Sequence, residues 1–360
     1  MHITKNKITF EESDMAFVKK FGIVEAVEMV LDYKSVFSLP FIYDTYQLIH
    51  FLDIGKKDFF DLMKNCDKAY QPIWLKKKNG SFREIYAPND QLKKYQNKIL
   101  NEILTKLPIS KYATAYRKGS TLVQNALPHV SKRYMLKLDI TDFFGSIYFD
   151  QVYSTAFHTR YFPKQIGVML TKLCCRKEVL PQGTPTSPTL SNIVMRNFDD
   201  NVGHWCEKHG ISYTRYCDDM TFSSDKPLFI VYQKAKTMLE EMGFELNEKK
   251  THFITNANKH IVTGLTVNEK ISVQRDYKRA LRQEVYYVLK FGMVENIIRI
   301  GRKDFIKGGL PDVVKYYNSL LGRIAFVLQI EPENTWFQNA LTELRTSEFL
   351  DGEMMLWKNC

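Results

Sequence analysis

The chain has 360 residues, of which 44% are hydrophobic, 13% aromatic and 25% charged. This composition excludes a disordered tail protein, a collagen-like repeat and a small disulfide scaffold. The formal net charge of +11 at pH 7 favours a polyanionic partner, either nucleic acid or an acidic membrane surface. No apolar run is long enough to span a bilayer, and acidic residues interrupt the N-terminal segment where a signal peptide would be apolar. The six cysteines form no CxxC pair, so we expect reduced thiols and a cytoplasmic protein with no membrane partner.

The first part of the chain predicts helices followed by a β-hairpin. Apolar residues between positions 11 and 70 recur at the spacing of an amphipathic helix. Two β-type runs, Ile73–Lys78 and Phe82–Tyr86, flank Asn79-Gly80, a dipeptide that supplies the positive φ values of a tight turn. Basic residues outnumber acidic ones between positions 72 and 100, so the hairpin lies in a basic segment.

The remaining chain divides into a mixed segment and a helical one. Residues 131–267 combine strand and helix patterns in an α+β manner, and residues 268–360 are mostly helical in pattern. The stretch 271–310 is again rich in lysine and arginine. Two basic segments therefore flank a central segment that contains the carboxylates of interest.

Three of these carboxylates are predicted to lie at neighbouring strand ends. Alternation along Tyr134–Ile140 places Asp139 at the end of a half-buried strand, with its carboxylate on the open side. The stretch Ile211–Phe222 reads as strand, turn and strand, with Asp218 and Asp219 at the turn. Such a group would suit a pair of Mg²⁺ ions, which prefer hard oxygen ligands and support phosphoryl transfer.

A pair of adjacent aspartates can also arise by chance in a chain of this size. A second pair, Asp199-Asp200, lies in a helical pattern, and we expect it to be a solvated helix surface. The residues that flank Asp218 and Asp219 distinguish the two pairs.

These flanking residues resemble known motifs. Tyr216–Asp219 resembles the YxDD box of reverse transcriptases, with Cys217 where alanine is commoner. Three further segments resemble other motifs of that family in the family's order: Leu138–Phe144, Leu180–Pro188 and Gly243–Thr251. The resemblance covers about residues 70–330 and implies a right-hand polymerase fold of the α+β class, with an antiparallel palm sheet and a helical thumb.

The same resemblance implies a domain order. Residues 1–70 would be an N-terminal helical extension leading into the fingers, and residues 71–130 would form the fingers. The palm would span 131–267, with part of the fingers at about 151–182, and the helical thumb would span 268–360.

Two short elements narrow the family. Asn125–His129 resembles the NAxxH element of retron reverse transcriptases, and Val262–Gly264 resembles their VTG triplet. Chance matches or a purely structural histidine remain the alternatives. Both elements would have an RNA-related role, together with a basic thumb face; the implied RNA-binding residues are Asn125, His129, Val262, Thr263, Gly264, Arg275, Lys278, Arg279 and Arg282.

The resemblance also assigns roles around the reaction. Asp139, Asp218 and Asp219 would be catalytic and would hold two Mg²⁺ ions. Phe144 would exclude the 2′-hydroxyl of a ribonucleotide, and Lys250 could protonate the departing pyrophosphate. The implied nucleotide-binding residues are Lys77, Arg83, Phe144, Gln182, Gly183 and Lys250. The structural alternatives are a core aromatic for Phe144, an ordinary loop for Gln182 and Gly183, and solvated surface for the lysines and the basic thumb helix.

The implied activity is RNA-directed DNA synthesis from dNTPs on a cognate structured noncoding RNA. Priming from a 2′-hydroxyl would give branched RNA-linked single-stranded DNA (msDNA), in a complex that serves anti-phage defence with an effector protein. A cellular ribonuclease H would trim the template. The alternatives are another bacterial reverse transcriptase (CRISPR-associated, abortive-infection or group II intron-like) and a non-catalytic RNA-binding scaffold on a polymerase fold.

Overall fold

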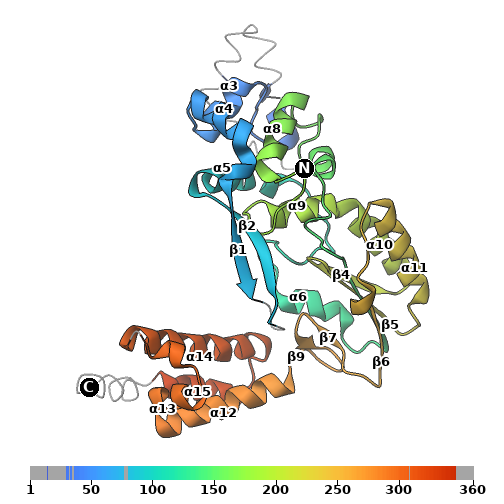
Figure 1. Ribbon diagram of the computed structural model, residues 1–360. Helices are drawn as coiled ribbons and strands as arrows, with labels where there is room; N and C mark the ends of the chain where they lie inside the picture. Colours follow the sequence, from blue (N-terminus) through green and yellow to red (C-terminus); the bar gives the residue numbers. More distant parts are fainter. Residues whose placement is uncertain are drawn as a thin grey trace. The chain divides into compact units, whose positions relative to one another are not determined.

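A computed structural model describes residues 14, 30, 31, 33, 34, 36–76, 80–307 and 309–345 (Figure 1). The chain forms two compact units, each described here by itself. The first combines Met1–Ser120 with Leu136–Phe253, and the second combines Thr121–Met135 with Ile254–Cys360. These divisions differ from the predicted fingers, palm and thumb boundaries, which stay a prediction.

The second helical pattern predicted in the N-terminal part of the chain forms two separate helices. Helix α3 spans Thr45–Leu52 and α4 spans Lys56–Asn65. The break lies at Asp53, whose left-handed backbone (φ 53°) ends α3. The side chain of Asp44 accepts a hydrogen bond from the Gln47 amide and so caps the start of α3. Most of the helical pattern predicted upstream lies outside the described residues.

The predicted β-hairpin is confirmed. Strand β1 (Tyr70–Lys76) pairs antiparallel with β2 (Phe82–Pro88), and Ile73 lies opposite Ile85. The described pairing runs from Tyr70 opposite Pro88 to Lys76 opposite Phe82. Lys77 and Asn79 lie outside the described residues, whereas Gly80 has the expected positive φ of 84°.

Several helices of the first unit pack against one another. Helix α5 (Asp90–Glu102) follows the hairpin, and α7 and α8 pack against each other. The other short or connecting helices of this unit are η1 (Cys66–Ala69), η2 (Leu104–Lys106), α7 (Phe149–Ala156), α8 (Lys164–Cys174), α9 (Ser187–Val194) and η4 (Glu248–Lys250).

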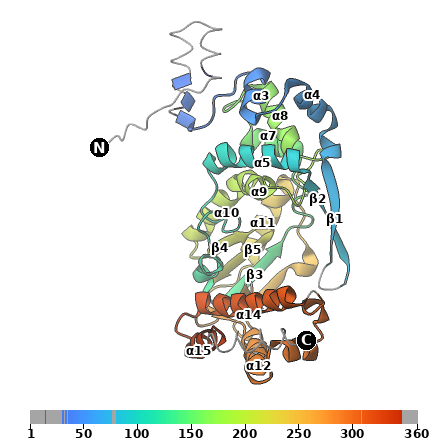
Figure 2. The same cartoon turned by 90° about the vertical axis from the view of Figure 1, so that its left-hand side faces the viewer.

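The central sheet has four strands in the order β4-β5-β3-β6. Strands β4 and β5 are antiparallel, and β3 lies between β5 and β6. Helices α10 and α11 lie together beside this sheet in two perpendicular views (Figures 1 and 2). The element bounds are β3 (Tyr134–Asp139), β4 (Ser212–Tyr216), β5 (Asp219–Ser224), β6 (His252–Thr255), α10 (Arg196–Lys208) and α11 (Phe229–Glu241). The α+β prediction for this segment is confirmed.

The second unit is mainly helical, as predicted for the C-terminal residues. A small antiparallel sheet precedes the helices, and the apolar faces of α12, α14 and α15 form one buried cluster. The bounds are α6 (Leu122–Ala126), η3 (Leu127–His129), β7 (Ile261–Val262), β8 (Leu265–Thr266), β9 (Ser272–Val273), α12 (Arg275–Phe291), α13 (Met293–Arg299), η5 (Lys303–Phe305), α14 (Leu310–Ile330) and α15 (Thr335–Leu344).

Two further observations concern the helices and the cysteines. Within the segments that the structure describes, no helix combines the length and apolarity that a bilayer crossing needs. The five cysteines in those segments are buried and unbridged; they are Cys66, Cys174, Cys175, Cys206 and Cys217.

Packing between α7 and α8 generates a stability prediction. A Cβ added at Gly167 would lie 2.2 Å from the carbonyl oxygen of Phe157, a backbone atom that cannot turn aside. We expect Gly167→Ala to lower the free energy of unfolding by about 1–3 kcal/mol. The matched control is Gly322→Ala on α14, where a Cβ meets nothing within 4 Å; it should be neutral or stabilise by about 1 kcal/mol. Equal thermal unfolding midpoints for the two variants would contradict the packing argument.

Candidate active site

The turn between β4 and β5 carries two of the three predicted carboxylates. Tyr216 pairs with Asp219, so only Cys217 and Asp218 form the loop. Two-residue hairpin loops require positive φ values, and Cys217 supplies one at 63°. The sequence predicted this strand-turn-strand arrangement, and the structure agrees.

Asp139 lies at the end of the neighbouring strand. Strand β3 is adjacent to β5 in the sheet, and the amide of Ile140 donates to the carbonyl of Asp218 at 3.3 Å. The pKa of Asp219 is raised above its ordinary value by desolvation and by the negative charges of Asp218 and Asp139. Desolvation is the largest cause of this raised pKa, and the charges of Asp218 and Asp139 act in the same direction. The three carboxylates therefore share one negative field.

Asp139 is buried, contrary to the expectation that its carboxylate faces the open side. Its exposure is 5%, because the ammonium of Lys250 covers it, with Nζ 2.9 and 2.8 Å from the two carboxylate oxygens. The amide of Asn247 donates to the carbonyl of Asp139 at 2.8 Å and so brings the short helix η4, which ends in Lys250, beside β3. These hydrogen bonds to Asp139 raise the pKa of Lys250, which keeps it protonated.

The three carboxylates suit a divalent cation in their charge and in their oxygen donors, and their arrangement is open. No three His, Cys, Asp or Glu side chains in the described part of the chain converge closely enough to hold a metal. The carboxylates are hard oxygen donors of the kind that Mg²⁺ prefers, and a cationic group, Lys250, is already attracted to Asp139. A metal bound to Asp139 would replace this ammonium.

The predicted nucleotide loop packs against the hairpin. The amide of Tyr86 donates to the carbonyl of Gln182 at 2.8 Å. Gly183 has φ 103°, and a Cβ there would approach the carbonyl oxygen of Tyr86 to 3.2 Å. The close approach that requires glycine is therefore to β2. Ile85 contacts the same position, and Arg83 is exposed on the same face of β2, two residues earlier.

Two further residues, Phe144 and Lys77, are predicted to bind the nucleotide. Phe144 is 9% exposed, with its ring 5.4 Å from that of Phe143, so it lies at the edge of the aromatic core. Lys77 lies outside the described residues. Sequence reasoning missed a hydroxyl network that holds this loop: Ser187 Oγ donates to the carbonyl of Pro181 at 2.6 Å and lies 2.6 Å from Thr184 Oγ1.

Asp199 contradicts the expectation of a solvated helix surface. Its side chain is 0% exposed and forms an ion pair with Arg215, at 2.6 Å between Nη2 and Oδ2. Asp200 is partly exposed and lies 3.5 Å from Arg196. Helical periodicity distinguishes these neighbours only when the buried face is known. The one available signal was Arg215, a charged residue between the β-type residues of the strand before the YxDD box.

The NAxxH and VTG elements meet within the second unit. Asn125 Nδ2 donates to Thr263 Oγ1 at 3.2 Å. Thr263 and Gly264 form the two-residue turn between β7 and β8, with φ values of 44° and 84°. Asn125, His129 and Val262 are buried, whereas Gly264 is exposed. Any RNA-related role of the buried members is therefore through the shape of this turn, and the role itself stays a prediction.

The basic face of α12 is only partly available for phosphates. Lys278 is paired with Glu331 at 2.7 Å, and the guanidinium of Arg282 lies over the rings of Trp336 and Phe337. Two of the predicted RNA-binding side chains on this helix are exposed, namely Arg275 and Arg279.

Burial of His129 generates a pH prediction. Desolvation lowers the pKa of His129 from 6.5 to about 3, so the unfolded chain binds a proton that the folded chain does not. We expect stability to fall as the pH decreases below about 6.5, by about 2 kcal/mol between pH 6.5 and pH 5. His129→Gln should remove this part of the pH dependence of the thermal midpoint. The exposed His50→Gln is the control, and identical pH profiles for all three proteins would refute the assignment.

Comparisons with known proteins identify the family. Residues 75–278 match the family described as Reverse transcriptase (RNA-dependent DNA polymerase). Retron Ec86 reverse transcriptase of Escherichia coli is 32% identical over 234 residues, covering 63% of this chain and 72% of that protein. Retron Ec83 reverse transcriptase, also of Escherichia coli, is 31% identical over 292 residues, covering 76% and 88% respectively. Retron Ec73 reverse transcriptase of the same species is 30% identical over 307 residues, covering 80% and 91%.

The matched span includes the three carboxylates, the nucleotide loop and the NAxxH and VTG elements. It also includes the antiparallel sheet that places Asp139 beside the Cys217–Asp218 turn. The chain therefore belongs to the retron-type reverse transcriptases, and it is an RNA-directed DNA polymerase with a right-hand polymerase fold.

Proposed function

We propose that Asp139, Asp218 and Asp219 form the catalytic group of this polymerase and hold two Mg²⁺ ions. The observation that carries the proposal is the adjacency of the β3 end and the β4–β5 turn, which gathers three carboxylates in one negative field. When bound, such ions supply activation of the primer hydroxyl and stabilisation of the departing pyrophosphate. Lys250 leaves Asp139 in that state, and its protonated amine becomes available to the leaving group.

The residues around this group would position the dNTP. Gln182 and Gly183 form the loop that packs against β2. Arg83 projects from the same face of β2 as Ile85, which contacts Gly183. Arg83 would supply a fixed fork of donors for the triphosphate, and Lys77 would supply a point charge. Phe144, at the edge of the core, would lie against the sugar and exclude a 2′-hydroxyl.

The first test replaces the turn carboxylates. In primer extension on an RNA template with Mg²⁺ and dNTPs, we expect Asp218→Asn and Asp219→Asn each to reduce the rate about a hundredfold or more, because stabilisation made only in the transition state is lost. Asp200→Asn, on a partly exposed helix position, should retain the wild-type rate. Wild-type rates in both turn variants would exclude the proposed catalytic group.

We further propose the retron reaction for this enzyme. The template would be a cognate structured noncoding RNA, the primer a 2′-hydroxyl of that RNA, and the product msDNA. The three retron relatives support this, as does the contact between the NAxxH and VTG elements in one buried framework. The exposed Arg275 and Arg279 would supply phosphate contacts that give affinity without sequence choice. An effector protein, a cellular ribonuclease H and a role in anti-phage defence complete the proposal.

The test is to isolate the protein from its host and map the nucleic acid that copurifies with it. We expect a DNA strand whose 5′ end stays joined to RNA until a debranching enzyme is added. Sequencing then gives the template and the priming nucleotide together. Unlinked RNA, with primer extension intact, would reject the 2′-primed reaction and favour another type of bacterial reverse transcriptase. RNA binding with no incorporation of dNTPs would indicate a scaffold instead of an enzyme.

A further inference from the structure

The guanidinium of Arg215 contacts the Cys217–Asp218 turn between β4 and β5. Arg215 is fully buried on β4, two residues before the left-handed Cys217. We infer that Arg215 is a positioning residue that sets the direction of Asp218 and Asp219. The inference rests on the proposed catalytic role of those two carboxylates.

The guanidinium makes a direct contact with the turn. Nη1 of Arg215 donates to the carbonyl oxygen of Cys217 at 2.9 Å. That carbonyl belongs to the peptide plane between Cys217 and Asp218, so its direction determines how the chain enters Asp218. Rotation of this plane would change the backbone direction at Asp218, the loop residue that precedes the paired Asp219.

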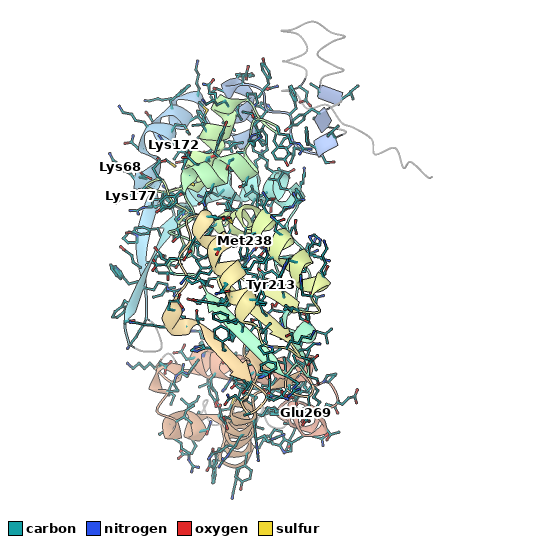
Figure 3. All side chains as sticks on the ribbon, turned by 90° about the vertical axis from the view of Figure 1, so that its right-hand side faces the viewer. Lys68, Lys172, Lys177, Tyr213, Met238 and Glu269 are labelled. Carbon is teal, nitrogen blue, oxygen red and sulfur yellow. The ribbon has the colours of Figure 1, made fainter. Side chains whose placement is uncertain are left out.

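Two other side chains, Asp199 and Asn192, accept hydrogen bonds from the guanidinium, and a third, Tyr213, holds Asp199. Asp199 accepts from Nε at 2.8 Å and from Nη2 at 2.6 Å, and Tyr213 Oη also donates to Asp199 at 2.8 Å. Asn192 accepts from Nη2 at 3.1 Å and donates to the carbonyl of Ala115 at 2.8 Å. Asn192 lies on α9 and Asp199 on α10, so these two helices hold the arginine in place. Tyr213, which is on the same strand as Arg215, is labelled in Figure 3. A bidentate pair of this kind leaves the arginine little rotational freedom.

The turn needs this support because of the residue at its first loop position. A left-handed backbone is unfavourable for a residue with a Cβ, and Cys217 adopts φ 63°. Two contacts oppose relaxation of the turn: the Arg215 hydrogen bond, and the hydroxyl of Tyr116, which donates to Cys217 Sγ at 3.2 Å. Errors of about 1 Å in the placement of catalytic groups can cost about a hundredfold in rate.

The test is Arg215→Lys, which keeps the buried positive charge beside Asp199 but replaces the fork by a single amine. That amine cannot bond Asp199 and the Cys217 carbonyl in the geometry of the guanidinium. In single-nucleotide incorporation we expect kcat to fall about tenfold to a hundredfold. The Mg²⁺ concentration for half-maximal rate should rise severalfold, while the KM for dNTP stays within about twofold of wild type.

A second readout does not depend on activity. Binding of Mn²⁺ to the free protein, followed by electron paramagnetic resonance, should weaken severalfold in Arg215→Lys. The matched control is the double variant Lys111→Met/Glu207→Gln, which removes an exposed ion pair whose acidic member, Glu207, lies on the same helix α10 as Asp199. It should leave kcat, the Mg²⁺ midpoint and Mn²⁺ binding unchanged.

A role in folding alone predicts a different pattern. It would lower the amount of active enzyme without moving the Mg²⁺ midpoint or Mn²⁺ affinity, and that result would overturn the inference. If Arg215→Lys does not fold, Arg215→Met/Asp199→Asn removes both buried charges together and undergoes the same measurements. Adding Cys217→Gly, which accepts φ 63° without strain, should restore part of kcat in either background.

The outcomes also separate this inference from the proposed catalytic group. Wild-type behaviour of Arg215→Lys, with Asp218→Asn and Asp219→Asn inactive, rejects only the positioning role. Full activity of Asp218→Asn and Asp219→Asn rejects the catalytic group and the inference together.

Discussion

The fully buried ion pair between Arg215 and Asp199 is the interaction on which the first unit depends most. It joins β4 to α10 and, through Asn192, to α9. Removing one partner of such a pair costs about 3–5 kcal/mol, because the other charge is left buried without compensation. The pair itself adds little net stability, since both groups lose their hydration. Its value lies in geometry: one guanidinium donates four hydrogen bonds to Asp199, Asn192 and the carbonyl of Cys217, and the last of these acceptors belongs to the turn that carries Asp218.

Charge balance around the carboxylates follows from the same sheet. Gathering three aspartates at neighbouring strand ends is unfavourable unless positive charge is near, and Lys137 and Lys250 act in that direction on Asp219. Lys250 belongs to the short helix η4, which lies beside the end of β3 because the amide of Asn247 donates to the carbonyl of Asp139. The ammonium of Lys250 thus offsets part of this negative charge, and a divalent cation would compete with it for Asp139.

The second unit uses polar residues in another way. Asn125 and His129 are buried, and Asn125 donates to Thr263 in the turn at Thr263-Gly264. Two successive positive φ values there favour a hairpin with the twist of its strands. Lys278 is held by Glu331, which also accepts from the backbone amide of Val273. Basic and motif residues in this unit therefore divide into those that build the scaffold and those, such as Arg279, that remain exposed.

The sequence alone determined the features that depend on neighbouring residues. Strand alternation and the two-residue turn placed Asp139, Asp218 and Asp219 at strand ends, and helical spacing predicted α12 and the helices after it. Tertiary structure decided which groups are covered. Asp199 and Asp200 are adjacent in one helix, yet only Asp199 faces Arg215, and Asp139 is covered by a lysine from far along the chain. Burial and ion pairing depend on contacts between distant segments, and periodicity in the sequence encodes the direction of a side chain but not its neighbour.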